Sequence, residues 1–261
     1  MADDQIDNKA LPSEVIGLYS FPKSGNTWLR QIVASALDIP ANILHKYVTD
    51  MHNGKIMQNP FIYNGKRLYI YKSHHRQLVV EHKEQKIKND KVVYIYRHPL
   101  DVFLSYINFL SKNVNSKAPT GLQFEIESVE NLSPDQLDAL YNVFLVYGTI
   151  TPQNRVFGGY FEHIFSAFAL RDQGFPIHIL EYEDLHTDFA KTASGVLEFL
   201  DIKGVDVETT RQEADKRTAQ DGKFFWKRQA ENYKNYLSEA QIAKFNRMYP
   251  DNMKLIGYPT A

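Results

Sequence analysis

One loop constrains the architecture more than any other segment: Ser20-Phe-Pro-Lys-Ser-Gly-Asn-Thr-Trp28. A β-rich apolar run over Val15–Phe21 leads into it, and a helical pattern over Trp28–Leu37 follows it. The positive end of that helix attracts an anion, Lys23 adds a mobile charge, and hydroxyl and amide side chains donate hydrogen bonds. The loop therefore predicts a site for phosphate-type oxygens. The alternative is that these residues only turn the chain and cap the helix.

The general pattern nearest to this loop is the phosphate-binding sequence G-x-x-x-x-G-K-[ST]. Gly17 through Ser24 match it, except that Pro22 stands at the second glycine. Proline fixes φ and lacks the N–H that a loop around a β-phosphate would use. A cradle for a nucleoside triphosphate would therefore be handicapped at its centre.

The rest of the chain alternates short apolar strands with helices, which is typical of a parallel sheet covered on both faces. Further strands are predicted over Leu68–Tyr71, Lys91–Tyr96 and Pro176–Glu181. Further helices are predicted over Leu78–Lys88, Pro99–Leu110, Pro134–Tyr147, Tyr160–Arg171, Phe189–Leu200 and Glu208–Ala219, and a last one opens at the Ser238 capping box. The polar stretch Ser111–Pro134 between them is predicted to be a long loop.

This order predicts a three-layer α/β/α fold with a central, mainly parallel sheet resembling that of P-loop proteins. We expect residues 1–13 to be a flexible N-terminal segment and residues 14–261 to form a single domain. Sites in such folds lie beyond the carboxyl ends of the strands.

Composition limits the possible partners. The 261 residues are 43% hydrophobic and 23% charged, as in ordinary globular proteins. A net charge of -1 argues against a surface built to coat nucleic acid or an anionic membrane, so any anion site must be local. The absence of cysteine excludes disulfides, thiolate zinc sites and a cysteine nucleophile. Without a signal sequence or a long apolar run, we expect a cytoplasmic protein with no stable membrane insertion.

Basic side chains follow the second predicted strand, in Tyr71-Lys-Ser-His-His-Arg76. Lys72, His74 and His75 should reach the same sheet edge as Lys23. A neutral imidazole there can accept a proton, and a neighbouring lysine can stabilise growing negative charge. The alternatives are that the histidines bind a metal whose other ligands are not evident, or that they only hydrogen-bond the loop.

The third strand ends in Tyr94-Ile-Tyr-Arg-His-Pro-Leu-Asp101, where Pro99 suits the first turn of a helix. Arg97 can grip a phosphate with two parallel hydrogen bonds, and Ser105 can reach the same group from that helix. The alternative pairs Arg97 with Asp101 and leaves Ser105 an ordinary helical residue.

In this order the segments resemble those of the soluble sulfotransferases that use 3′-phosphoadenosine-5′-phosphosulfate (PAPS). The first loop is similar to the family's Tyr-Pro-Lys-Ser-Gly-Thr-Thr-Trp, and Lys72-Ser-His74 to its Lys-Thr-His. The spacing from Arg97 to Ser105 matches its 3′-phosphate motif. Phe157-Gly-Gly-Tyr-Phe-Glu-His163 and Leu180-Glu-Tyr-Glu-Asp-Leu185 resemble two further family segments, so that the likeness covers about Val15 to Tyr258.

The resemblance implies a role for each matching residue. Lys23 would stabilise the leaving phosphate, and His74, aided by Lys72, would be the general base, with His75 as the second choice. Three sets of residues would hold the nucleotide. The 5′ side would be held by Ser24, Gly25, Asn26 and Thr27, the adenine would be sandwiched or flanked by Trp28 and Tyr182, and the 3′-phosphate would be held by Arg97 and Ser105. No metal is implied, and the product of the donor would be 3′-phosphoadenosine 5′-phosphate (PAP).

The chain departs from the family near its end. The family's Arg-Lys-Gly-x-x-Gly becomes Trp226-Lys-Arg-Gln-Ala-Glu231, which retains Lys227 and offers Arg228 for the missing arginine. Both glycines are lost, which leaves open how this segment would hold the 3′-phosphate. A clear match to the family's C-terminal dimer motif is also missing, so the oligomeric state stays open.

The implied reaction moves a sulfuryl group from PAPS to a hydroxyl or amine of a small-molecule, sugar or lipid acceptor. Two other hypotheses remain. One is a P-loop kinase, against which Pro22 and the lack of an obvious magnesium-binding aspartate both count. The other is a non-catalytic nucleotide or polyanion binder that uses the basic strand edge. Aromatic residues among basic ones near Trp226 would suit RNA, but helix packing or adenine contact explains them as well.

Overall fold

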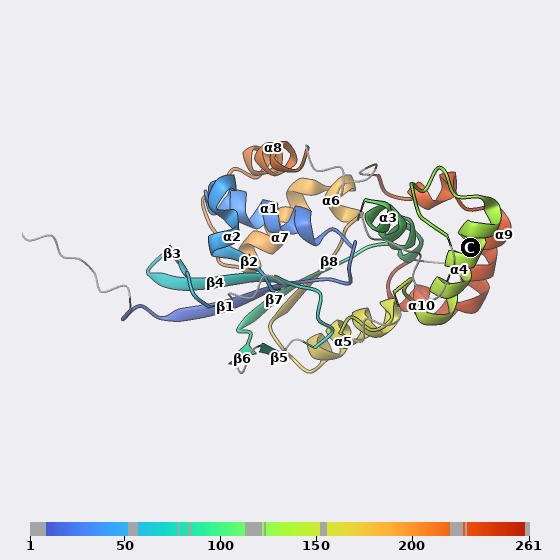
Figure 1. The fold of residues 1–261 in the computed structure, drawn as a ribbon. Coiled ribbons are helices and arrows are strands. Elements are labelled where there is room, and N and C mark those ends of the chain that lie inside the picture. Colours follow the sequence, from blue (N-terminus) through green and yellow to red (C-terminus); the bar gives the residue numbers. More distant parts are fainter. Residues whose placement is uncertain are drawn as a thin grey trace, which may run out of the picture.

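The computed structural model describes residues 9–51, 57–77, 79–82, 85–112, 122, 124–151, 156–219, 227 and 229–258. Six strands in these ranges form one sheet in the order β2-β4-β1-β7-β8, with β3 paired to β4 (Figure 1). Every pair is parallel except β3 with β4, which confirms the predicted, mainly parallel sheet. The strands are β1 (Ser13–Tyr19), β2 (Val48–Asp50), β3 (Phe61–Tyr63), β4 (Lys66–Ser73), β7 (Lys91–Tyr96) and β8 (Ile177–Glu181).

Helices cover both faces of the sheet, which confirms the three-layer prediction (Figure 1). One face carries α1 (Asn26–Ala36), α2 (Leu44–Tyr47), α6 (Asp184–Thr187), α7 (Phe189–Phe199) and α8 (Val207–Thr218). On the other side lie α3 (Pro99–Ser111), α4 (Pro134–Tyr147), α5 (Tyr160–Asp172), α9 (Glu239–Met248) and α10 (Pro250–Leu255).

The central strand β1 supplies both hydrophobic cores, because successive side chains of a strand point to opposite faces. Ile16 and Leu18 pack with α1 and α7, whereas Val15 and Tyr19 pack into the cluster formed with α3, α4 and α5. All four are buried. An apolar residue at almost every position is therefore the mark of a strand enclosed between two helical layers.

The predicted ends of two helices are confirmed by their caps. Ser238 accepts from the N–H of Gln241 at 3.2 Å, and the Gln241 side chain accepts from the N–H of Ser238 at 2.8 Å. Ser133 forms the same reciprocal capping box at the start of α4.

The helix predicted over Leu78–Lys88 is wrong. The described residues there form an antiparallel hairpin of β5 (Val79–His82) and β6 (Gln85–Lys88), with Val80 opposite Ile87. Adjacent β-branched valines and the alternation of charged residues around Ile87, which is buried beside an exposed Lys88, favour a strand over a helix.

The registers bring four strand ends to one edge of the sheet. Tyr19 pairs with both Ser73 and Tyr94, and Tyr96 pairs with Glu181. The residues that follow β1, β4, β7 and β8 therefore leave the sheet on the same side. Lys72 lies inside β4, because that strand extends two residues beyond its predicted end.

Candidate active site

The loop after β1 turns through two left-handed residues. Lys23 has φ 71° and Gly25 has φ 101°. At Gly25, which is the N-cap of α1, a Cβ atom would lie 2.5 Å from Cδ2 of Tyr182, so only glycine fits. Gly25 has no side chain to cap this helix, and no side-chain cap is found there among the described residues, so the first N–H groups of α1 have no side-chain acceptor of that kind.

Donors in this loop suit an anion. Ser24 is fully buried, and its Oγ has no hydrogen-bond partner among the described residues. A buried hydroxyl without a partner costs free energy unless a ligand satisfies it. Beside it, the uncapped N-terminus of an eleven-residue helix carries a partial positive charge. The residues present therefore fit a phosphate or sulfate group, with the half-buried Thr27 in the same turn.

The side-chain amide of Asn26 is engaged within the protein. Its Nδ2 donates to the carbonyl of Leu18 at 3.0 Å, to Oγ of Ser20 at 3.2 Å and to the carbonyl of Ser73 at 3.3 Å. The amide thus ties the ends of β1 and β4 together from inside the loop.

Lys23 extends from the loop toward α3. Its Nζ lies 4.8 Å from the centroid of the Phe109 ring, within the range of a cation–π contact. The side chain is only half-buried, so the ammonium stays within reach of a ligand at the mouth of the loop.

The imidazole of His74 is oriented by the end of β1. Its Nδ1 lies 2.9 Å from the carbonyl oxygen of Ser20 and 3.3 Å from the Oγ of the same residue. A carbonyl only accepts, so Nδ1 carries the proton and the lone pair of the neutral ring is on Nε2. The ring packs edge-on against Phe157, at 6.0 Å between centroids. His74 therefore has the tautomer that a general base requires.

Lys72 and His75, the other two basic residues of this segment, make different contacts from His74. Lys72 is buried and its Nζ forms a 2.9 Å ion pair with the Asp50 carboxylate at the end of β2. His75 is half-buried, and its backbone N–H donates to Oγ of Ser73 at 3.0 Å. No group of three or more metal-binding side chains comes together among the described residues.

Arg97 is buried where β7 meets α3. Its guanidinium donates to the carbonyl of Gln229 at 2.8 Å, lies 3.5 Å from Asp101 and stacks 4.5 Å from the Tyr182 ring. The ion pair offered as an alternative is therefore present. The Nε of Arg97 is buried and has no hydrogen-bond partner among the described residues.

Two buried polar side chains, Ser105 and Asn108, lie on α3, the helix that follows Arg97. They are one turn apart on the helix. The Asn108 Nδ2 has no hydrogen-bond partner in the described part of the chain. It is a second donor on the helix that carries Ser105.

Burial governs the titration of the groups around Arg97. Desolvation, with smaller contributions from Arg97 and Lys234, lowers the pKa of His98 to about 3. His98 stacks on the Tyr233 ring at 4.3 Å, and its Nδ1 accepts from the N–H of Leu100, capping α3. Burial also raises the pKa of Asp101, although Arg97 opposes that shift.

Trp28 and Tyr182 contact each other directly. Their ring centroids are 5.7 Å apart at an interplanar angle of 66°, and both residues are buried. The Trp28 Nε1 has no hydrogen-bond partner among the described residues. In this arrangement the rings can flank an adenine, whereas a base between them would require them to separate.

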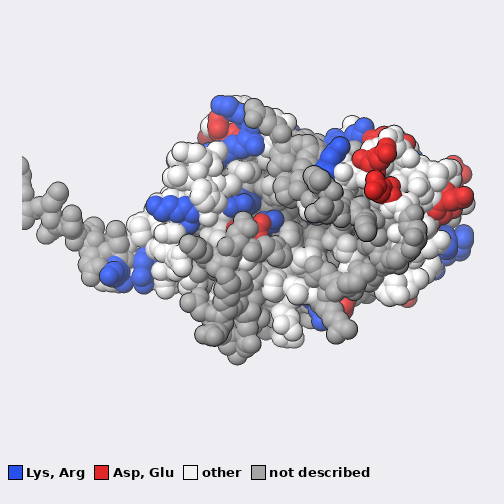
Figure 2. All heavy atoms as spheres, in the orientation of Figure 1, with Lys and Arg blue, Asp and Glu red and all other residues white. Residues whose placement is uncertain are grey.

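Lys227 points to the surface. Its Nζ lies 3.4 Å from a Glu130 carboxylate oxygen, which also accepts from the Tyr236 hydroxyl at 3.1 Å. Acidic side chains gather over this end of the molecule near α4 and α9 (Figure 2). The structure therefore brings Lys23, His74 and Arg97 to one sheet edge but turns the Lys227 ammonium to Glu130. Arg228 and Trp226 lie outside the described residues.

Sequence reasoning missed several partners of these residues. Ser20 accepts from His74, Asp50 pairs with Lys72, and the Gln229 carbonyl accepts from Arg97. None of them lies in a local sequence pattern that marks it as a partner.

The comparisons with known proteins agree with this geometry. Residues 14–257 match the sulfotransferase domain. The chain belongs to the sulfotransferase family. Sulfuryl transfer is thus favoured over the kinase and the non-catalytic binder.

Two curated relatives span nearly the whole chain. An amine sulfotransferase of Oryctolagus cuniculus is 22% identical over 96% of this chain and 84% of its own length. A 3-beta-hydroxysteroid sulfotransferase of Cavia porcellus is 22% identical over 92% of this chain and 83% of its own length.

Solved structures share the fold. A mouse sulfotransferase complexed with PAP superposes with a TM-score of 0.62, at 20% identity, over 92% of this sulfotransferase and 85% of that chain. Retinol dehydratase in a complex with retinol and PAP superposes with a TM-score of 0.60, at 16% identity, over 95% and 83%. In the described part of this sulfotransferase, no helix has both the length and the apolar character needed to span a bilayer.

Proposed function

We propose that this sulfotransferase uses PAPS to transfer a sulfuryl group to a hydroxyl or amine of a small apolar acceptor. One observation carries the proposal: the carbonyl of Ser20 fixes His74 in the tautomer with its proton on Nδ1 and its lone pair on Nε2, beside a loop whose buried Ser24 hydroxyl has no partner among the described residues. A base and an anion site thus lie on one edge of the sheet.

The chemical step needs little from the protein beyond positioning and charge. His74 Nε2 takes the acceptor proton as the acceptor oxygen or nitrogen forms its bond to sulfur. The bond between sulfur and the bridging oxygen of the donor breaks, and its electron pair stays on that oxygen. Lys23, with Ser24 and the N-terminus of α1, holds the negative charge that grows there. Lys72, restrained by Asp50, adds positive charge near the base.

We further propose the nucleotide contacts that the family resemblance implies. Ser24, Gly25 and Thr27 would hold the 5′ side, with Asn26 bracing the loop from within. Trp28 and Tyr182 would flank the adenine. At the other end Arg97 and Ser105 would hold the 3′-phosphate. Lys227 is paired with Glu130 and would add little to the affinity, and Arg228 is a further candidate from the family resemblance.

The acceptor class follows from the walls beside the base. Phe157 packs against His74, and Phe109 lies under the Lys23 ammonium. Aromatic walls favour a largely apolar acceptor with a single polar group directed at the base. The names of the relatives, an amine and a hydroxysteroid sulfotransferase, agree with such a molecule.

We further propose that residues 14–261 act as one domain in the cytoplasm. One sheet joins strands from both halves of the sequence, and helices of both halves bury its two faces. The lack of cysteine suits a reducing compartment.

The first experiment is thermal unfolding with PAP, ATP or ADP. PAP at 100 times its Kd should stabilise the protein by about 2.7 kcal/mol, and the other two nucleotides should stabilise it less. Transfer of labelled sulfate from PAPS to a panel of phenols, hydroxysteroids and aryl amines, in the presence of EDTA, should follow. Equal stabilisation by ATP with no transfer to any acceptor would contradict the proposal.

A further inference from the structure

A buried histidine outside the predicted site touches the main chain of the proposed base. His163, on α5, is completely buried. Its Nε2 lies 3.1 Å from the carbonyl oxygen of His74, and its Nδ1 lies 2.6 Å from the hydroxyl of Tyr94 on β7. Both ring nitrogens are therefore satisfied, one by the main chain of His74 itself.

The direction of each hydrogen bond follows from the chemistry of the partners. The His74 carbonyl only accepts, so Nε2 of His163 carries the proton and Nδ1 accepts from Tyr94. Burial raises the pKa of the Tyr94 hydroxyl well above its usual value and lowers the pKa of His163 to about 4. Both groups stay neutral near pH 7, so donor and acceptor do not exchange.

This bond complements the one from Ser20. Ser20 sets the rotation of the His74 ring, whereas His163 sets the position of the main chain that carries the ring. The same helix also holds Arg76, two residues further on, because Glu162 forms an ion pair with its side chain. The Ser166 hydroxyl lies within hydrogen-bond distance of the carbonyls of both Arg76, at 3.1 Å, and His163, at 2.7 Å. The end of β4 is thus held along α5.

Packing alone does not account for a histidine here. The ring contacts Phe21 and Tyr94, with centroids 5.7 Å and 5.6 Å away, and an apolar side chain could fill that space without the cost of burying two polar atoms. The imidazole adds a donor aimed at one particular carbonyl.

We infer that His163 is a positioning residue for His74: its Nε2–H holds the His74 carbonyl and thereby fixes where the His74 imidazole meets the acceptor. This inference rests on the proposed function of His74 as the general base. The role is distinct from contact with the substrate.

Two substitutions separate the effect of the His163 Nε2–H donor from the effect of its side-chain size. In His163→Gln the amide nitrogen reaches the place of Nε2, whereas in His163→Asn the amide reaches only the place of Nδ1. His163→Asn should lower kcat by about 10- to 100-fold while leaving the Kd for PAP within about twofold, because a misplaced base costs rate and not nucleotide affinity. His163→Gln should recover most of that loss.

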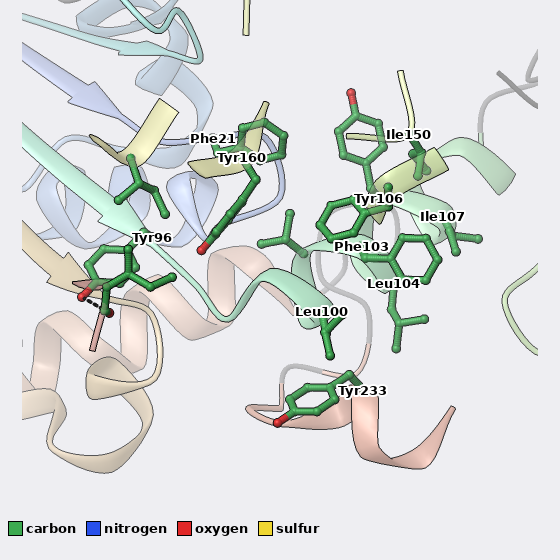
Figure 3. Close-up of a cluster of buried hydrophobic side chains, with 14 of the residues drawn as sticks. Phe21, Tyr96, Leu100, Phe103, Leu104, Tyr106, Ile107, Ile150, Tyr160 and Tyr233 are labelled. Atoms are coloured by element: carbon green, nitrogen blue, oxygen red, sulfur yellow. Dashed lines mark hydrogen bonds between the residues drawn. The ribbon is translucent and has the colours of Figure 1, made fainter. Parts of the chain in front are cut away.

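A control comes from the same helix. The Tyr160 hydroxyl donates to the main-chain carbonyl of Arg97, and Figure 3 shows it pointing at the segment between β7 and α3. Tyr160→Phe therefore also removes one buried donor from a carbonyl, three positions before His163, but not at His74.

The deciding readout is the ¹⁵N spectrum of histidine-labelled protein, with His74 identified by comparison with His74→Ala. The wild type, His163→Gln and Tyr160→Phe should all show His74 protonated on Nδ1. His163→Asn should show shifted or averaged His74 signals. Unshifted His74 signals together with a kcat within twofold of the wild type would overturn the inference.

The test also covers a variant that does not fold and a wild type that shows no activity. If His163→Asn does not fold, Tyr94→Phe decides, since it keeps the imidazole but removes the donor that fixes its tautomer; wild-type kcat and His74 signals in that variant would overturn the inference. If the wild type transfers sulfate to no acceptor, the proposed function fails, and the spectra alone still decide whether His163 orients His74.

Discussion

The loop after β1 and the surroundings of Arg97 are built in opposite ways. The first is a continuous run of nine residues, and it offers a buried Ser24 hydroxyl with no partner among the described residues and a helix start that no side chain caps. Around Arg97, by contrast, the charge is already shared with Asp101, the Tyr182 ring and the carbonyl of Gln229, 132 positions away.

This difference separates rate from affinity. The loop after β1, at one end of the site, is preorganised by its local backbone, and a ligand there meets donors that no described residue satisfies. At the other end, around Arg97, a phosphate must share or replace the internal partners of the guanidinium. Part of the phosphate's binding energy therefore offsets the loss of those contacts. We therefore expect substitutions at the first end to act on kcat and those at the second to act on nucleotide binding.

The largest effect is expected at Lys23. Lys23→Ala should lower kcat by about 10³-fold, because it removes the cation nearest to the developing charge. Lys46→Ala is a matched control, since Lys46 also lies over an aromatic ring, that of Tyr47, but is exposed on α2. Steady-state rates at saturating donor measure both. A loss below tenfold for Lys23→Ala would remove the contrast between the two ends.

Arg97→Ala should act mainly on binding. We expect the Kd for PAP to rise by about 100-fold, as for the loss of hydrogen bonds to a charged group, with kcat changed far less. The variant should also lose stability, because Asp101 stays buried without its ion pair.

Adding Asp101→Asn separates these two effects of Arg97→Ala. The double variant should regain thermal stability but not PAP affinity, as measured by calorimetry and melting. If PAP affinity returned with stability, Arg97 would serve the fold and not the ligand.

Acid should weaken the Arg97 end through His98. Burial holds its folded-state pKa near 3, below the usual 6.5 of the unfolded chain, so the unfolded state takes up the proton first. His98 therefore contributes full stability above about pH 6.5, and that contribution is lost as the pH falls toward 3. At pH 5 the free energy of unfolding should have lost about 2 kcal/mol of the His98 contribution.

His98→Asn isolates this contribution, because an asparagine can still cap α3 but does not titrate. The variant should show a smaller drop in Tm between pH 7 and pH 5 than the wild type. The difference between the two proteins cancels the opposite contribution of carboxyls such as Asp101, whose pKa is raised by burial. Parallel pH profiles would show that His98 does not control this region.

The smallest effect is expected at Lys227. Its side chain is 45% exposed and paired with an equally accessible Glu130, and such surface pairs contribute little. Lys227→Ala should change the Kd for PAP by less than about threefold, and Glu130→Gln should have a similarly small effect of opposite sign. A rise above tenfold for Lys227→Ala would mean that this lysine leaves Glu130 to hold the nucleotide.

The parts of the molecule that were predicted correctly share one property: their cause lies within a few residues. The strand before Ser20, the α1 helix after it and the Ser238 capping box each follow from local pattern. The helix predicted over Leu78–Lys88 failed because its local pattern was ambiguous. A charged run reads equally well as a helix face or as a hairpin until its partner strand is known, and β5 and β6 select each other.

The candidate site divides along the same line. Lys23, His74 and Arg97 were predictable because each follows a strand of recognisable pattern, and parallel strands must deliver their ends to one edge. Their partners Ser20, Asp50 and the Gln229 carbonyl were not, because hydrogen bonding between distant segments leaves no periodic trace.

By itself, then, the sequence determined which chemical groups this sulfotransferase carries and on which edge of the sheet most of them emerge, since apolar periodicity and loop chemistry are local properties. Only the tertiary structure decided which groups are already engaged. It pairs Lys72 with Asp50, turns Lys227 to Glu130 and places His163 under the main chain of His74. These choices depend on distances between segments far apart in the chain, and packing of the whole fold sets those distances.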